Sequence, residues 1–150
     1  MSYNKLTRVP GSIGELESLR ELNLSHNKII YLPSEVGRLD RLRTLDVNSN
    51  CLLGLPSAIF SQSGCLSLRT VDMSANQIDE LPDSIGNLSN LKSLNIGQNQ
   101  VKYLPSSMKR LSLVESLNYG ENPWIQSLPS SATGKAYGTN ALHVIYTLAL

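Results

Sequence analysis

This 150-residue chain has few aromatic residues, and neither positive nor negative charges predominate in it. Aromatic residues make up 5% of the sequence, so aliphatic side chains must fill most of its core. The formal net charge is +1, which gives no strong field for attracting nucleic acid or anionic lipid. Hydrophobic residues still make up 41%, against 17% charged residues. This balance predicts a soluble, globular chain with no nucleic-acid partner.

Cysteine and long apolar runs are scarce as well. The two cysteines, Cys51 and Cys65, form no CxxC pair and are too few for a disulfide framework. This favours a reducing compartment. Residues 1–10 lack the apolar core of a signal peptide. No stretch reaches the roughly 18 apolar residues that a spanning helix needs. We therefore expect a cytoplasmic protein with no membrane span.

Six asparagines recur in one sequence context and define a repeat. They are Asn4, Asn27, Asn50, Asn76, Asn99 and Asn122, with spacings of 23, 23, 26, 23 and 23 residues. The last five close the pattern L-x-x-L-x-L-x-x-N. A Leu-Pro or Val-Pro pair follows the asparagine in every unit, with one residue added before it in the unit of Asn122. We assign a repeat domain to residues 1–129. Its partial first repeat covers 1–18, and further repeats start near residues 19, 42, 68, 91 and 114.

The x-L-x-L core of each unit alternates with period two, as in a strand with one buried face. We place strands near 21–24, 44–47, 70–73, 93–96 and 116–119. Stacked copies then form a parallel sheet, and the linker P-x-x-I-G-x-L supplies the crossover as a short helical or irregular convex segment. The 26-residue unit carries three extra residues within 60–66. We expect them to form a polar stretch on the convex side.

The recurring asparagine falls where each strand turns away. Its amide offers both a donor and an acceptor to backbone groups of its own unit and of the adjacent one. Losing the amide would leave buried backbone groups unsatisfied, at about 1–3 kcal/mol each. The asparagine column is therefore predicted to be structural.

These units resemble the leucine-rich-repeat family. The 23-residue length and the L-P-x-x-I-G-x-L linker are similar to its intracellular, Ras-signalling-associated branch, with plant Ras-group repeat proteins, Ras–MAPK scaffolds and Ras-suppressor proteins. The resemblance implies an α/β solenoid shaped as a curved right-handed horseshoe. Its parallel sheet would line the concave face, with short helical or irregular segments on the convex face. It also implies a protein partner such as a Ras-type small GTPase, a phosphatase or a kinase.

The two ends of the chain differ from the repeats. The sequence begins inside a unit, which favours a fragment of a longer protein or a partial gene product over a chain with an open N-terminal edge. We assign residues 130–150 to a C-terminal cap, with Trp124 as an anchor over the final repeat. A helix near 138–148 is similar to the G-T-x-A-I-x-x-Y-L helix that follows intracellular arrays of this kind.

Strand residues that face away from the core form the candidate partner-binding site. The predicted residues are Arg20, Glu21, Asn23, His26, Arg43, Asp46, Asn48, Arg69, Asp72, Lys92 and Asn95. Two rows emerge when the units are stacked: a basic row and a polar-acidic row. The basic row is Arg20, Arg43, Arg69 and Lys92, and the polar-acidic row is Asn23, Asp46, Asp72 and Asn95. Either they recognise a partner through ion pairs and hydrogen bonds, or they are solvated and pair with each other.

The sequence offers no constellation for catalysis, metal binding or a cofactor. His26 has no cysteine or second histidine at ligand spacing, and neither cysteine has an activating neighbour. We therefore expect a protein-interaction module or scaffold in intracellular signalling, not an enzyme. The alternative is the recognition arm of a larger enzyme, such as a kinase, a ubiquitin ligase or a GTPase. A receptor ectodomain is a third hypothesis, for which cysteine-rich caps and a signal peptide would be expected.

Overall fold

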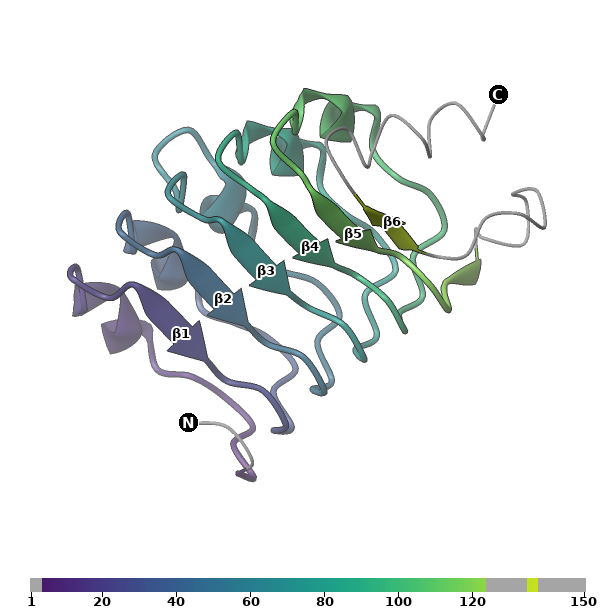
Figure 1. Ribbon diagram of the computed structural model, residues 1–150. Coiled ribbons are helices and arrows are strands. Elements are labelled where there is room, and N and C mark those ends of the chain that lie inside the picture. The colour runs from purple at the N-terminus through teal and green to yellow at the C-terminus, as the bar shows by residue number, and fades with distance from the viewer. Residues whose placement is uncertain (1–3, 124–134, 138–150) are drawn as a thin grey trace.

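Six short strands form one sheet in the computed structural model, which describes residues 4–123 and 135–137 (Figure 1). The strands follow one another in chain order across the sheet. They are β1 (Glu21–Asn23), β2 (Thr44–Asp46), β3 (Thr70–Asp72), β4 (Ser93–Asn95), β5 (Ser116–Asn118) and β6 (Lys135–Tyr137). The first five pair in parallel, which confirms the predicted sheet. The sixth pairs antiparallel with β5 and was not predicted.

The parallel strands pair so that equivalent positions of successive repeats lie opposite each other. Leu22 lies opposite Leu45, Leu45 opposite Val71, and Val71 opposite Leu94. All four side chains are buried. Each central leucine or valine therefore packs on its equivalents in the units before and after it. Alternation along the strand leaves the flanking residues on the other face of the sheet.

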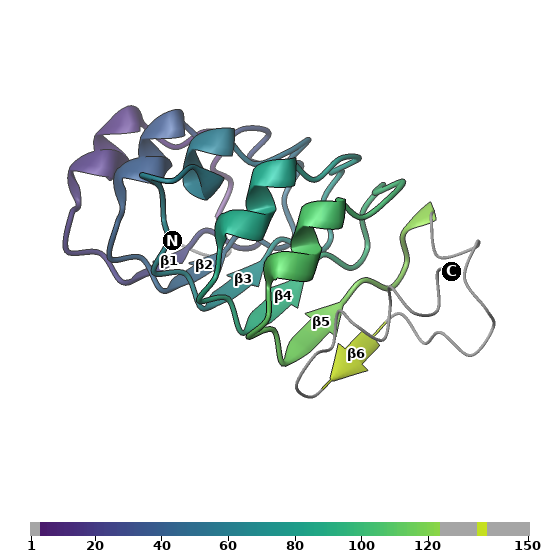
Figure 2. The same ribbon diagram turned by 90° about the horizontal axis from the view of Figure 1, so that it is seen from above.

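Five short 3-10 helices form the second layer, opposite the sheet (Figure 2). They are η1 (Gly11–Glu15), η2 (Ser34–Arg38), η3 (Ser57–Phe60), η4 (Asp83–Asn87) and η5 (Ser106–Arg110). A proline precedes each one, with φ between −70° and −59° and ψ between 132° and 150°. Proline fixes its own φ and has no N–H to leave unpaired at a helix start. The predicted short helical segments are thereby confirmed.

The aliphatic core lies between these two layers. It is built from leucine, isoleucine and valine, with few aromatic side chains. Phe60 and Cys65 belong to this core, because both are fully buried. The expectation of a polar stretch over residues 60–66 was therefore wrong in part. Its ends turn inward and fill the core, and only Gln62 and Ser63 are exposed.

The buried asparagines connect neighbouring units. Asn50 accepts a hydrogen bond from the N–H of Ile29 in the preceding unit (3.0 Å). Its amide donates to the Leu24 carbonyl of that unit (3.0 Å) and to its own Val47 carbonyl (3.1 Å). The same acceptor bond is made by Asn27, Asn76, Asn99 and Asn122. Asn4 is exposed.

Some expectations lie outside the described residues. These are the Trp124 anchor, the helix near 138–148 and the boundary at residue 129. Within residues 4–123 and 135–137, no helix has the length and apolar character that crossing a membrane requires.

Candidate partner-binding face

The concave face is the surface of the sheet turned away from the 3-10 helices. Strand register aligns its side chains in columns that run across β1 to β5. One column is Glu21, Thr44, Thr70, Ser93 and Ser116; the next is Asn23, Asp46, Asp72, Asn95 and Asn118. All ten residues are exposed or half-buried. The face is therefore polar and accessible along five units.

The basic row borders these columns at the start of each strand. Arg20, Arg43 and Arg69 are exposed, and within residues 4–123 none of them forms a salt bridge. Lys92 pairs with Glu115, the residue that continues the row in the last unit, at 3.2 Å. The basic row thus does not pair with the polar-acidic row. Three guanidinium groups are left to solvent or to a partner.

The residues of the polar-acidic row also form hydrogen bonds that stabilise the fold. In every unit its side-chain oxygen accepts the backbone N–H two residues further on, as Asp46 does from Asn48 (3.1 Å) and Asp72 from Ser74 (2.9 Å). The corresponding bonds of Asn23, Asn95 and Asn118 hold Ser25, Gly97 and Gly120. Such bonds fix the turn at the end of each strand. These residues are therefore structural as well as accessible.

The amides in this row also donate hydrogen bonds to its two carboxylates. Asn23 Nδ2 donates to Asp46 Oδ2 at 3.1 Å, and Asn95 Nδ2 donates to Asp72 Oδ2 at 3.0 Å. Asn48 donates its side-chain amide to Asp46 as well. The acidic groups are thus held in place before any partner arrives.

His26 lies in the turn that follows β1. Its φ of 53° is in the left-handed region, which residues with a side chain rarely adopt. The same region is occupied at this position in every later unit, by Ser49, Ala75, Gln98 and Glu121. Across the described part of the chain, no group of three or more potential metal-ligating side chains occurs. The position of His26 is that of a turn residue shared by all five units.

A hollow of about 400 Å³ opens at the C-terminal end of the concave face. Seven residues line it: Ser74, Asn95, Gly97, Gln98, Asn118, Gly120 and Glu121. Of these, only Asn95 was among the predicted partner-binding residues. The sequence feature that could have indicated this hollow is the presence of glycine at positions 97 and 120. Earlier units carry serine or asparagine there. Without those side chains the surface is indented beside the Gln98–Glu121 hydrogen bond (3.1 Å).

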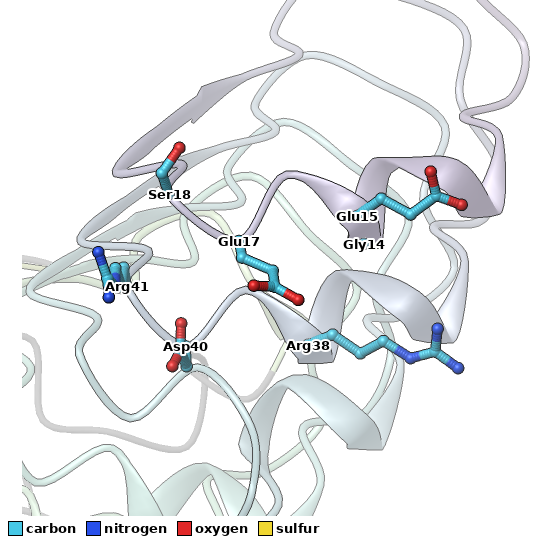
Figure 3. A pocket seen from close by; sticks show the side chains of 7 residues that line it. All are labelled: Gly14, Glu15, Glu17, Ser18, Arg38, Asp40 and Arg41. Carbon is cyan, nitrogen blue, oxygen red and sulfur yellow. The ribbon is translucent and has the colours of Figure 1, made fainter.

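A second hollow, of about 570 Å³, lies between the turns that leave η1 and η2 (Figure 3). Its charged lining residues are Glu15, Glu17, Arg38, Asp40 and Arg41. Figure 3 shows Glu17 between Arg38 and Arg41, with all side chains open to solvent. Mixed exposed charges without a buried polar group are typical of a solvated surface rather than of an active site.

The two cysteines have different environments. Cys65 is fully buried and its thiol donates to the Val36 carbonyl at 3.1 Å. Burial raises the pKa of Cys65 to about 11, although a backbone hydrogen bond at Leu39 acts in the opposite direction. Cys51 is half-buried, and neither cysteine forms a disulfide. A buried thiol with a raised pKa is a poor nucleophile, so Cys65 serves packing.

Two family models for leucine-rich repeats match the chain, over residues 17–61 and 40–101. Among solved structures, the chain is similar to the leucine-rich-repeat protein LIC12759 of Leptospira interrogans, with 32% identity and a TM-score of 0.58. It is also similar to the ectodomain of the receptor kinase GASSHO1/SCHENGEN3 of Arabidopsis thaliana, with 29% identity and a TM-score of 0.69. That ectodomain was solved with CASPARIAN STRIP INTEGRITY FACTOR 2.

A third similar structure is the functional domain of InlJ from Listeria monocytogenes, with 23% identity and a TM-score of 0.65. The matches cover 79%, 77% and 82% of this chain, in the order given. They cover only 36%, 14% and 24% of the other chains, so this chain spans less than half the length of each. No curated protein matched the chain.

Proposed function

Because this chain belongs to the leucine-rich-repeat family, we propose that it binds another protein on its concave face. Repeat solenoids present extended concave surfaces that suit protein recognition. The observation that carries the proposal is the basic row. Arg20, Arg43 and Arg69 repeat at one position in successive units, are exposed, and have no ion-pair partner within residues 4–123.

The chemistry of the face favours a partner with an acidic strip. Guanidinium groups form paired hydrogen bonds with carboxylates, and three in a row fix the direction of an approaching chain. Glu21 lies beside this row, whereas His26 and Asn48 follow the other ends of their strands; all three belong to the proposed contact. Trp and Tyr, the usual anchors of tight interfaces, are absent from the predicted residues. Binding through this segment is therefore electrostatic and moderate in affinity.

At a finer level, we propose a cytoplasmic scaffold in signal transduction. The support is the 23-residue unit with its L-P-x-x-I-G-x-L linker, which resembles the Ras-associated branch. The partners to test first are a Ras-type small GTPase, a phosphatase subunit and a kinase. No catalytic role is assigned to the chain.

A second candidate is that the chain is the recognition arm of a larger protein. The observation that favours it is length, because the chain spans 14% of a receptor-kinase ectodomain with the same fold. On this hypothesis the concave face still binds the ligand, and a fused domain supplies the response. A full-length transcript that encodes a kinase, ubiquitin ligase or GTPase domain would support it.

The test compares two variants with the same change in charge. The concave variant carries Arg43→Glu and Arg69→Glu, and the control carries Arg38→Glu and Arg41→Glu on the hollow of Figure 3. All four arginines are exposed and make no described salt bridge, so both variants should fold. Each is used with the wild-type chain to capture proteins from a lysate and to titrate purified small GTPases.

We expect the concave variant to lose its specific partner, with affinity reduced at least about tenfold, one decade being 1.4 kcal/mol. The control should keep wild-type affinity. Equal binding by all three chains would overturn the proposal. Equal loss by both variants would also overturn it, since net charge alone would then explain binding.

A further inference from the structure

One flank of the solenoid carries a pattern that the concave face does not. It is formed by the segments that run from the C-terminal ends of the strands back to the 3-10 helices (Figures 1 and 2). We call this surface the flank and define it by the third and fourth residues after each asparagine, together with the neighbouring charged residues Lys5, Lys28 and Asp83. The third residues are Thr7, Ile30, Leu53, Asp79 and Lys102, and the fourth are Arg8, Tyr31, Gly54, Glu80 and Tyr103. All are exposed except the half-buried Gly54.

The middle of the flank is apolar. Ile30 is 43% exposed, Leu53 44% and Tyr31 65%, and they occupy two successive units. The Leu53 N–H donates to the Ile30 carbonyl at 3.4 Å, which places the two units side by side. A Cβ at Gly54 would meet no atom within 4 Å, so the surface is open beside them. Exposed aliphatic and aromatic side chains gathered in this way mark an interaction surface.

The two ends of the flank carry opposite charges. Lys5, Arg8 and Lys28 are exposed at the N-terminal end and form no described salt bridge. Asp79, Glu80 and Asp83 are exposed toward the C-terminal end, where Lys102 and Tyr103 follow them in the next unit. Among residues 4–123, Lys102 pairs with Asp79 (3.4 Å), and neither Glu80 nor Asp83 forms a salt bridge there. A hydrogen bond with Glu80 raises the pKa of Tyr103, which locates that phenol in the acidic end.

A surface ordered as basic, apolar, acidic is complementary to itself. Consider a two-fold axis that passes through the apolar centre and is perpendicular to the long axis of the solenoid. It relates the chain to a second copy that runs in the opposite direction. The apolar centres then face each other, and each basic end faces the acidic end of the other copy. Isologous contacts of this kind are the commonest form of protein dimer.

We propose that the flank is the contact surface of a two-fold symmetric dimer of this chain. The dimer leaves both concave faces open, so it does not rest on the proposed function and is compatible with it. The contact has a small apolar centre and charged ends. It is therefore weak and sensitive to ionic strength, as small and polar interfaces are.

The test is a charge swap followed by sedimentation velocity over a series of concentrations at low salt. One variant carries Arg8→Glu and Lys28→Glu, so that both ends of its flank are acidic. The other carries Glu80→Lys and Asp83→Lys, so that both ends are basic. Arg38→Glu with Arg41→Glu is the matched control for the first variant, since it makes the same charge change away from the flank. Circular dichroism verifies that every variant is folded.

We expect the wild type and the control to dimerise with the same midpoint concentration. Each swap variant alone should need at least about tenfold more protein, since like charges then oppose each other. A one-to-one mixture of the two variants should dimerise again. Tyr31→Ser should shift the midpoint in the same direction as the single swaps, because it removes apolar contact.

Three results would overturn the proposal. One is a wild type that stays monomeric at every concentration. Another is a mixture of the two swap variants that stays monomeric while the wild type dimerises. The third is a swap variant that dimerises like the wild type. None of these bears on partner binding by the concave face, which the Arg43 and Arg69 variant tests separately.

Discussion

At the scale of single residues, the turn after each strand depends on two side chains and one unusual backbone angle. The ladder asparagine satisfies backbone groups of two units, and the residue of the polar-acidic row holds the N–H two places on. Between them lies the residue with φ near 50°. The turn is thus specified by local hydrogen bonds, and the strand positions follow from it.

Asn76→Asp should destabilise the chain, because it removes the amide that donates to the carbonyls of Val47 and Met73 (both 3.0 Å). It also buries a charge beside them. We expect a loss on the order of 3 kcal/mol in the free energy of unfolding, measured by urea denaturation. Gln77→Ala, at the exposed neighbour, is the control and should change little. Equal stability of Asn76→Asp and the wild type would contradict the structural role of the asparagine.

Ala75→Gly should stabilise the chain, although glycine usually destabilises. Ala75 has φ of 51°, where a Cβ costs about 1–2 kcal/mol and glycine costs nothing sterically. Glycine also raises the conformational entropy of the unfolded chain, which offsets part of this effect. We therefore expect the free energy of unfolding to rise by about 0.5–1 kcal/mol. Ala58→Gly in η3, where φ is not positive, should destabilise instead. Thermal unfolding of both variants decides the sign.

Cys65 should make the free energy of unfolding depend on pH in the alkaline range. Burial raises its pKa from 9.0 to about 11, so the folded chain keeps a proton that the unfolded chain releases. Stability should therefore fall as the pH rises from about 9 to 11. The slope should be smaller in Cys65→Ala, whatever its stability at neutral pH. Urea denaturation at pH 8 and pH 10.5 measures the difference, and parallel slopes for the two chains would refute it.

The sequence alone predicted the structural asparagines but not the double role of the polar-acidic row. Asn23, Asp46 and Asp72 occupy outward positions, which makes them candidates for partner contact from the pattern alone. Their bonds to backbone N–H groups depend on the turn conformation, which an alternating pattern does not report. Reversing Asp46 or Asp72 to arginine would therefore disturb the turn as well as the surface. Arginines of the basic row are the cleaner positions to mutate.

At the scale of elements, the strands were predictable because every unit repeats the same alternation. Strands expected at 21–24 and 44–47 are observed at Glu21–Asn23 and Thr44–Asp46. β6 was missed, because Lys135–Tyr137 lies outside the repeat and only its pairing with β5 makes it a strand. Phe60 and Cys65 were expected in a polar insertion. Their burial follows from the packing of η3, which the local composition hides.

The glycine in each P-x-x-I-G-x-L linker sets how closely successive 3-10 helices approach. A Cβ on Gly86 would lie 2.4 Å from the Ser107 carbonyl oxygen of the next unit. Gly86→Ala should therefore destabilise the chain by about 2 kcal/mol through overpacking. Gly54→Ala is the matched comparison, because a Cβ there meets no atom within 4 Å. It should leave stability unchanged or raise it slightly in the same urea titration, whereas equal effects of both alanines would exclude the packing explanation.

At the scale of the whole molecule, the chain presents separate surfaces on one rigid scaffold. The concave face repeats one chemistry across successive units, as a site for an extended partner requires. The flank instead changes from basic to apolar to acidic along the same axis. The family resemblance predicted the first surface, since stacked units reveal rows directly. It did not predict the second, because exposure of Ile30, Tyr31 and Leu53 depends on where the tertiary fold leaves them.

The most direct test of concave binding is an NMR titration of the labelled 16.4-kDa chain with its captured partner. We predict that backbone amide shifts change first at residues 43–49 and 69–75, and that Arg43→Glu with Arg69→Glu abolishes these changes. Shifts confined to η1–η5 or to the flank, with the concave amides unmoved, would contradict the account.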